Sequence, residues 1–229
     1  MDFNITQDIF SAFSLPESAT LSYNPSIYQK QEKIIQGVTL AVNQDPLVIS
    51  LLKQMKERIG SHYDHTIRTG IMHIDLISFE QPTWKDIPPK TINLVGILHD
   101  CGKLEVPEEI LFKEKELTIW EKRVMEAHNR ATYNILRSFE DNYPAIAQIA
   151  AFHHPYFQPQ EVSENPSIRR AGELLRLADH YDALSSRRDY KSPFSPQLIQ
   201  EILLDLFPKE GPRINHLLQH YPSKEFSII

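Results

Sequence analysis

The segment from Ile92 to Lys103 reads INLVGILHDCGK, a nearly all-apolar run that ends in two ionisable side chains and a glycine. Its length and composition predict a short buried helix ending near His99, with a buried strand as the alternative. A histidine beside an aspartate at the end of a buried element is costly unless both groups have partners. His99 and Asp100 therefore predict either a polar pocket at the helix end or an ordinary helix terminus at the surface.

Other predicted helices carry side chains of the same kinds. These are His65, His128, the pair His153-His154 at the end of an apolar run, and Asp179 with Asp182. Asp179 and Asp182 are three residues apart, so they share a helix face. Each residue alone is compatible with a structural or exposed role. Together with His99 and Asp100 they mark five helices, and helix bundles build two-metal sites from ligands on facing helices in this way.

Proline and capping signals predict helices along nearly the whole chain. Asn-Pro or Asp-Pro pairs predict helix starts at residues 25, 46 and 166, and Thr118 with Glu121 forms a capping box. The predicted helical segments are about 25–42, 46–60, 67–77, 91–99, 118–139, 144–154 and 166–184, with two shorter helices opened by Pro196 and Pro212. We therefore predict one compact all-α domain, in which residues 1–60 and 192–229 are additions to a central core.

The composition narrows the classes of function. Lys and Arg total 24 against 30 Asp and Glu in 229 residues, and a net charge of −6 gives no global reason to bind duplex nucleic acid or an anionic membrane. No apolar run is long enough to span a membrane, and the N-terminus lacks the features of a secretory leader. The single cysteine, Cys101, excludes an internal disulfide framework and favours the cytoplasm. Ten histidines remain to be explained, and imidazole is a common metal ligand.

Three segments resemble one known family. Residues 99–111, HDCGKLEVPEEIL, are similar to the HD-x-GK…VP-x-x-IL segment of the HD-domain metal-dependent phosphohydrolases, and specifically of their HD-GYP group. Residues 117–128 resemble the LT-x-x-E…H stretch of that group, and residues 178–191 resemble its AD-x-x-DAL…R-x-Y-K ending. The resemblance covers about residues 61–191. It implies an all-α HD-domain bundle with additional helices before and after it.

The resemblance also implies an activity and a site. The activity would be metal-dependent hydrolysis of cyclic di-GMP or a related cyclic dinucleotide. By position, the metal ligands would be His65, His99, Asp100, His128, His153, His154 and Asp179. Asp100 would bridge two divalent metals, and both Asp100 and Lys103 would be catalytic. Lys103, Arg188 and Lys191 would bind the substrate. Fe or Mn are the expected ions, with Mg, Ni or Zn as alternatives.

Two neighbours of these residues allow more than one interpretation. Asp182, one turn from Asp179, is predicted either to orient a metal ligand or to cap local structure. Cys101 is predicted to pack as a small apolar residue in the core, because the other donors are hard oxygen and nitrogen atoms.

The sequence departs from the HD-GYP pattern at two places. The glycine-containing GYP signature is absent after His154, where residues 155–161 read PYFQPQE. Ser61 stands where members with three metals have a Glu, which favours two metals, although His62 and Asp64 are close by. Three alternatives therefore stay open: an HD phosphohydrolase acting on another nucleotide, a di-iron oxygenase, and a degenerate domain that senses a nucleotide or docks a partner. A homodimer is compatible with all of them.

Overall fold

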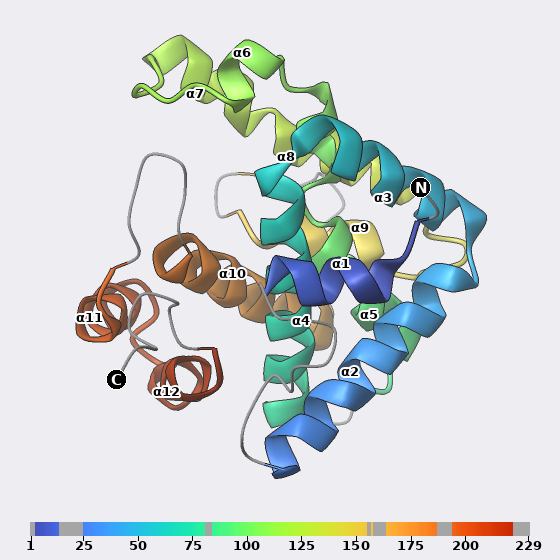
Figure 1. Ribbon diagram of the computed structural model, residues 1–229, viewed down its shortest axis with the longest axis vertical. Coiled ribbons are helices and arrows are strands. Elements are labelled where there is room, and N and C mark those ends of the chain that lie inside the picture. Colours follow the sequence, from blue (N-terminus) through green and yellow to red (C-terminus); the bar gives the residue numbers. More distant parts are fainter. Residues whose placement is uncertain are drawn as a thin grey trace.

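The computed structural model describes residues 3–13, 25–80, 84–154, 157, 164–186 and 194–221 (Figure 1). Within these residues the chain is helical and forms no strand, which confirms the predicted all-α class. The elements are α1 (Ile5–Ala12), α2 (Pro25–Asn43), α3 (Pro46–Ile59), α4 (Ser61–Glu80), α5 (Pro89–Leu98), the 3-10 helix η1 (Cys101–Glu105), α6 (Glu108–Leu111), α7 (Ile119–Glu126), α8 (His128–Arg137), α9 (Ile146–Ala151), α10 (Pro166–Ser185), α11 (Pro196–Leu206) and α12 (Gly211–His220).

Helix α4 runs through the middle of the molecule (Figure 1). It packs against α5, α10 and α1, and α9 lies against both α5 and α10. Isoleucines spaced three and four residues apart on this helix belong to the core: Ile67 and Ile71 are fully buried, and Ile74 and Ile77 are each 6% exposed. Burying a side chain of this size contributes roughly 1.5–3 kcal/mol. Helix α4 is therefore the element on which the other helices are assembled.

Two glycines let α4 and α5 cross at backbone distance. A Cβ atom at Gly96 would lie 2.6 Å from the Cα of Gly70, and one at Gly70 would lie 2.8 Å from the amide nitrogen of Ile97. Neither contact is possible for a residue with a side chain. The crossing brings the C-terminal end of α5, with His99 and Asp100, to a fixed place on the surface of α4.

Most of the predicted helices are confirmed. Asp45 caps α3 by accepting from the amides of Leu47 and Val48, and Gly60 ends α3 with a left-handed φ of +47°. The segment that was ambiguous between helix and strand is helix α5. The helices α1 and α6 and the 3-10 helix η1 were not predicted as separate elements.

The long helix predicted over residues 118–139 was wrong. The Thr118–Glu121 capping box is present, but α7 ends at Glu126 and α8 begins at His128. In a continuous helix the carbonyl of Met125 would accept from the amide four residues later. Here it accepts from the imidazole Nδ1 of His128 at 2.5 Å. A side chain has taken the place of a backbone donor, and the helix breaks at this point.

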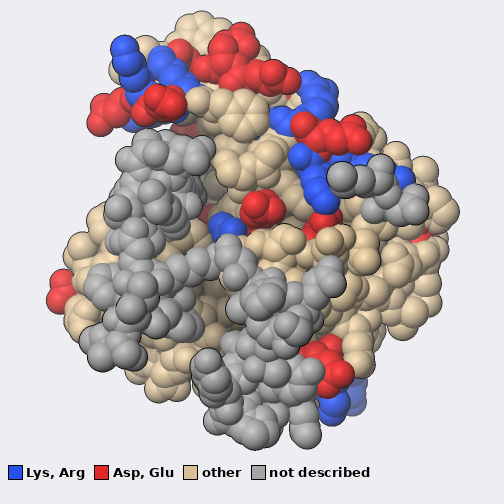
Figure 2. Space-filling model, in the orientation of Figure 1, with Lys and Arg blue, Asp and Glu red and all other residues tan. Residues whose placement is uncertain are grey.

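On the face drawn in Figure 2, acidic and basic side chains are interspersed, and both kinds meet in a recess below α6 and α7.

Among the described residues no single helix is long and apolar enough to cross a membrane. One pair of helices, Lys30–Asn43 with Pro46–Ile59, is long and apolar enough only when taken together, and the two helices are bent by 106° relative to each other.

Candidate metal centre

Five elements bring the seven predicted ligands together. His65 comes from α4, His99 and Asp100 from the end of α5, His128 from the start of α8, His153 and His154 from the end of α9, and Asp179 from α10. Their donor atoms form two groups, and within each group the atoms lie within 4.8 Å of one another. One group is Asp100, His128, His153 and His154, and the other is His65, His99 and Asp179. Seven residues spread over 115 positions of sequence thus form two adjacent donor sets.

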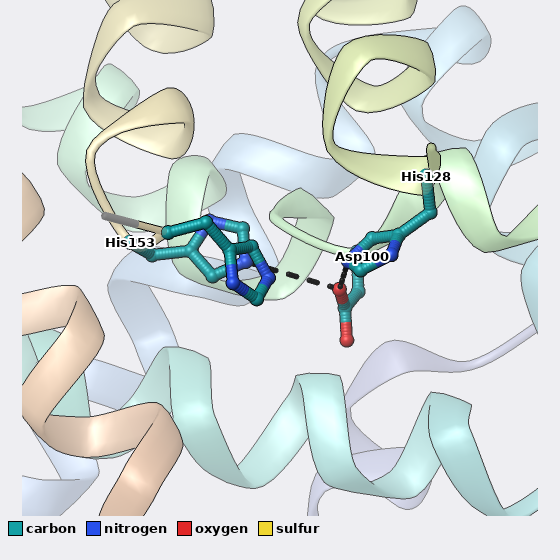
Figure 3. A group of neighbouring side chains, drawn as sticks. Asp100, His128 and His153 are labelled. Carbon is teal, nitrogen blue, oxygen red and sulfur yellow. Dashed lines mark ion pairs between the residues drawn. The ribbon is translucent and has the colours of Figure 1, made fainter. Parts of the chain in front are cut away.

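Asp100 lies between the two groups and turns one oxygen toward each. Its Oδ1 is 3.1 Å from the Nε2 of His128 and 4.0 Å from the Nε2 of His153 (Figure 3). Its Oδ2 is 3.5 Å from the Nε2 of His99 and 3.9 Å from the Nε2 of His65. A carboxylate in this position can contribute an oxygen atom to each of two neighbouring cations.

Three of the histidines are oriented by the same local device. The Nδ1 atoms of His99, His128 and His153 each donate to the carbonyl three residues earlier, on Gly96, Met125 and Ala150 respectively. Carbonyls in the last turn of a helix lack intrahelical partners, so the imidazole satisfies an otherwise orphaned acceptor. A proton on Nδ1 leaves the lone pair of a neutral imidazole on Nε2. The local backbone therefore selects both the tautomer and the nitrogen that faces the centre.

The inward-facing nitrogens of these histidines have no hydrogen-bond partner in the part of the chain that the structure describes. The Nε2 atoms of His99, His128 and His153 are all buried and all orphaned. Buried polar atoms are rarely left unpaired, because doing so costs about 1–3 kcal/mol each. Three such atoms converging on one carboxylate form a donor set that fits a divalent metal, for which neutral imidazole and carboxylate are suitable ligands.

His65 is held differently, by two carboxylates on α10. Its Nδ1 lies 2.7 Å from Asp182 Oδ2, and its Nε2 lies 3.0 Å from Asp179 Oδ1. Burial alone would lower the pKa of His65, but the hydrogen bonds to Asp179 and Asp182 outweigh it and raise the pKa. Because Asp182 occupies the nitrogen that points away from the centre, it has the geometry of a residue that orients a ligand.

Around Asp100, His153 and His154 the charges favour an ionised carboxylate and neutral imidazoles, whereas His65 is held between two carboxylates. Burial by itself would raise the pKa of Asp100, but Lys103 and the surrounding histidines outweigh it and hold the pKa well below the usual range. Burial lowers the pKa of His153, and it lowers the pKa of His154 to about 4, with His128 adding to the effect. These are the protonation states in which such groups bind cations.

Lys103 lies beside the bridging carboxylate. Its Nζ is 2.5 Å from Asp100 Oδ2 and 3.5 Å from the Nδ1 of His62. The Nε2 of His62 lies 3.3 Å from the carbonyl oxygen of Leu111. Burial and the adjacent Lys103 lower the pKa of His62 to about 3. In the described residues His62 and Asp64 belong to neither donor group, and His62 instead contacts the lysine.

Gly102 and Cys101 serve packing. A Cβ atom at Gly102 would lie 2.7 Å from Thr132 Oγ1 and closer still to the backbone of α8, and the Gly102 amide donates to Thr132 Oγ1 at 2.9 Å. Gly102 does not have a positive φ, so the close approach to α8 is what requires a glycine. Cys101 is fully buried and belongs to neither donor group of the described residues, as predicted.

Arg68 was not identified from the sequence. It lies one turn after His65 on α4, and its guanidinium makes two parallel hydrogen bonds to Asp182. The spacing of three residues between His65 and Arg68 was the available signal, but it could not reveal a partner 114 positions away. The predicted substrate residues Arg188 and Lys191, and most of the segment that replaces the GYP signature, lie outside the described residues.

Comparison with known proteins gives one family match and several relatives. The HD domain family model matches residues 48–184, more than half of the chain. The chain is 30% identical over 154 residues to a protein of Thermotoga maritima named cyclic di-GMP phosphodiesterase, covering 64% of this chain and 40% of that one. It is 32% identical over 131 residues to 3'3'-cGAMP-specific phosphodiesterase 2 of Vibrio cholerae, covering 54% and 25% of the two chains.

A third relative is a cyclic di-GMP phosphodiesterase of Vibrio cholerae, 36% identical over 118 residues, with 47% of this chain and 24% of that protein covered. The chain thus spans between about a quarter and two fifths of the length of these relatives. The family match includes all seven residues of the two donor groups. The resemblance noted in the sequence is confirmed at the level of the family, and the chain belongs to the HD domain family.

Proposed function

We propose that the chain is a metal-dependent phosphodiesterase that hydrolyses cyclic di-GMP or a related cyclic dinucleotide at a centre of two divalent ions. The observation that carries this proposal is the division of the seven donors into two groups with one Asp100 oxygen facing each. Two-metal sites of this kind serve phosphodiester hydrolysis in many enzymes. The names of the relatives from Thermotoga maritima and Vibrio cholerae support cyclic dinucleotides as the substrate class.

One group would hold the first ion through His128, His153 and His154, and the other would hold the second through His65, His99 and Asp179, with Asp100 shared. When bound, two divalent ions supply Lewis-acid polarisation of a phosphoryl oxygen and lower the pKa of the attacking water. Fe or Mn are the ions we expect, with Mg, Ni or Zn as alternatives, because the donors are imidazole nitrogens and carboxylate oxygens without a thiolate.

Other side chains of the chain would stabilise developing charge and bind the substrate. Lys103, 2.5 Å from Asp100, places a positive charge where negative charge develops on the phosphoryl oxygens. The Nδ1 of His62 accepts a hydrogen bond from the same ammonium and would help to fix its position beside the centre. Arg188 and Lys191 are proposed to bind the substrate together with Lys103. The division into residues 1–60, 61–191 and 192–229 and a cytoplasmic location both stay predictions.

Turnover with defined metals tests the proposal. The purified chain, loaded with Mn²⁺ or Fe²⁺, is assayed on cyclic di-GMP, 3'3'-cGAMP and a generic aryl phosphodiester, with Asp100→Asn as the inactive control. We expect metal-dependent hydrolysis that the substitution abolishes. Hydrolysis of another nucleotide, but not of cyclic dinucleotides, would change the assigned substrate class. The absence of the GYP signature makes this outcome worth testing. Binding of a cyclic dinucleotide without hydrolysis would replace the enzyme with a sensor.

A further inference from the structure

The guanidinium of Arg68 lies directly behind the donor group of His65, His99 and Asp179. Its Nε donates to Asp182 Oδ1 at 2.6 Å and its Nη2 to Asp182 Oδ2 at 2.8 Å, the bidentate arrangement that only arginine provides. Both side chains are largely buried, with 15% of Arg68 and 3% of Asp182 exposed. The pair is therefore little screened by solvent.

Each carboxylate oxygen of Asp182 accepts two hydrogen bonds. Oδ2 accepts from Arg68 and from His65 Nδ1, while Oδ1 accepts from Arg68 and from the hydroxyl of Ser186 at 2.9 Å. A carboxylate that accepts four hydrogen bonds has one orientation. Removing the two bonds from Arg68 would free Asp182 to rotate, and the His65 ring would lose its fixed position.

We propose that Arg68 is a positioning residue for the metal held by His65, His99 and Asp179, acting on His65 through Asp182. The inference rests on the metal centre of the proposed function.

The two donor groups differ in how they are supported, so the effect of Arg68 is selective. His128 and His153 are oriented by carbonyls of their own backbone, three residues away. His65 is oriented by a side chain 117 positions away, and that side chain is held by Arg68. Loss of Arg68 therefore disturbs one donor of the second group and leaves the first group's local support unchanged.

The same guanidinium also connects the centre to the N-terminal helix. Its Nη1 donates to the carbonyl of Ala12 at the end of α1, 3.2 Å away. Helix α1 is held on α4 and α3 by Asp8, which accepts from Tyr63 at 2.8 Å and from Lys56 at 2.6 Å. The orientation of His65 thus depends on contacts that reach from α10 through α4 to α1.

Calorimetric titration with Mn²⁺ alone tests the inference on the full chain, because it needs no turnover. The variants are Arg68→Met and Arg68→Lys, and the matched control is Arg170→Met. Arg170 is also a partly buried arginine in an ion-pair network, with Glu80, Glu173 and Glu210, away from the centre. We expect wild type and Arg170→Met to bind two ions with the same affinities. Arg68→Met should weaken one site about 10–100-fold and leave the other unchanged.

The outcomes separate the inference from the proposed function. Arg68→Lys, which keeps the charge without the bidentate geometry, should weaken the same site by less, and it decides the question if Arg68→Met does not fold. Equal affinities in wild type and Arg68→Lys, or equal weakening of both sites, would overturn the positioning role. A wild-type chain that binds no Mn²⁺ would instead overturn the metal centre itself.

Discussion

Two of the buried clusters that are built around an aspartate, those of Asp75 and Asp100, differ in how their polar groups are paired. Asp75 on α4 is 2% exposed and pairs with Lys30 Nζ at 2.5 Å, His216 Nε2 at 2.8 Å and the Tyr221 hydroxyl at 3.0 Å. Asp100 is equally buried, yet three histidine nitrogens around it have no hydrogen-bond partner among the described residues. The carboxylate of the first cluster is paired with side chains of the protein, whereas in the second those three imidazole nitrogens remain free to bind a cation.

The pairing of the polar atoms distinguishes a structural polar cluster from a binding site. Both clusters contain histidine beside a buried carboxylate, so residue type alone does not distinguish them. In the Asp75 cluster, Lys30, His216 and Tyr221 bring α2, α12 and the residue after α12 onto α4. In the Asp100 centre the backbone holds the rings of His99, His128 and His153 so that their Nε2 atoms, which are unpaired in the described part of the chain, point inward. The clusters should therefore respond differently to the same kinds of change.

The largest contrast is in activity. Asp100→Asn removes a charge from both donor groups, and we expect turnover of a cyclic dinucleotide to fall by at least about 10⁴-fold. Asp75→Asn should leave the rate per folded molecule unchanged. Initial rates with saturating Mn²⁺, normalised to the folded fraction, measure both. Equal losses in the two variants would mean that the clusters do not divide the roles in this way.

For stability we expect the Asp75 cluster, and not the Asp100 centre, to show the larger effect. Asp75→Asn leaves Lys30 and His216 without their carboxylate, and we expect the free energy of unfolding to fall by about 3 kcal/mol. Urea denaturation in the presence of a chelator measures it, so that metal binding does not contribute. Ser78→Ala, on an exposed turn of the same helix, serves as a control with little expected effect. If Asp75→Asn lowered the free energy of unfolding by less than about 1 kcal/mol, the cluster would not be stabilising the fold.

Metal addition should separate the clusters again. Mn²⁺ at about 100 times its dissociation constant is expected to raise the free energy of unfolding by about 2.7 kcal/mol for a single site. Asp75→Asn should gain the same increment as wild type, and Asp100→Asn should lose most of it. Thermal melts with and without the metal give the comparison. An undiminished increment in Asp100→Asn would place the ion elsewhere.

The smallest effect is on the pH dependence of stability. Burial would raise the pKa of Asp75, but hydrogen bonds to His216 and Lys30 outweigh it and lower the pKa below its usual value. A lowered folded-state pKa stabilises the protein above the unfolded pKa of about 3.9, and this contribution is lost as the pH falls from there toward the folded value. The stability difference between wild type and Asp75→Asn should therefore shrink as the pH falls below about 4. Urea titrations at several pH values with chelator present measure it; a difference that grows toward acid pH would contradict the assignment.

Sequence signals predicted the structure correctly where the interacting residues are neighbours along the chain. The capping of α3 by Asp45 and the Thr118–Glu121 capping box involve residues within one helical turn, and both are present. The break between α7 and α8 could not be predicted, because it depends on whether His128 bonds to the backbone or turns to solvent. In the folded chain the ring of His128 is buried beside Asp100, which is 28 positions away, and no local pattern specifies that contact.

Residues that act through distant partners were missed for the same reason. Arg68 has no distinguishing feature in the sequence beyond its place one turn after His65. Its contact with Asp182 exists only because α4 and α10 pack together. His62, which contacts Lys103, is a similar case, since α4 and η1 meet only in the folded chain.

By itself, the sequence determined the kinds of donor, the helices that carry them and the family to which they belong. Periodicity and caps are properties of single elements, so they specify which residues share a face. They do not specify how one helix is rotated and shifted against the next. The tertiary structure alone decided that the seven donors divide into two groups, that Asp100 presents one oxygen to each, and that Asp182 holds His65 from behind. These arrangements follow from the packing of α4 against α5 and α10, where the glycine crossing sets the relative position of elements that are far apart along the chain.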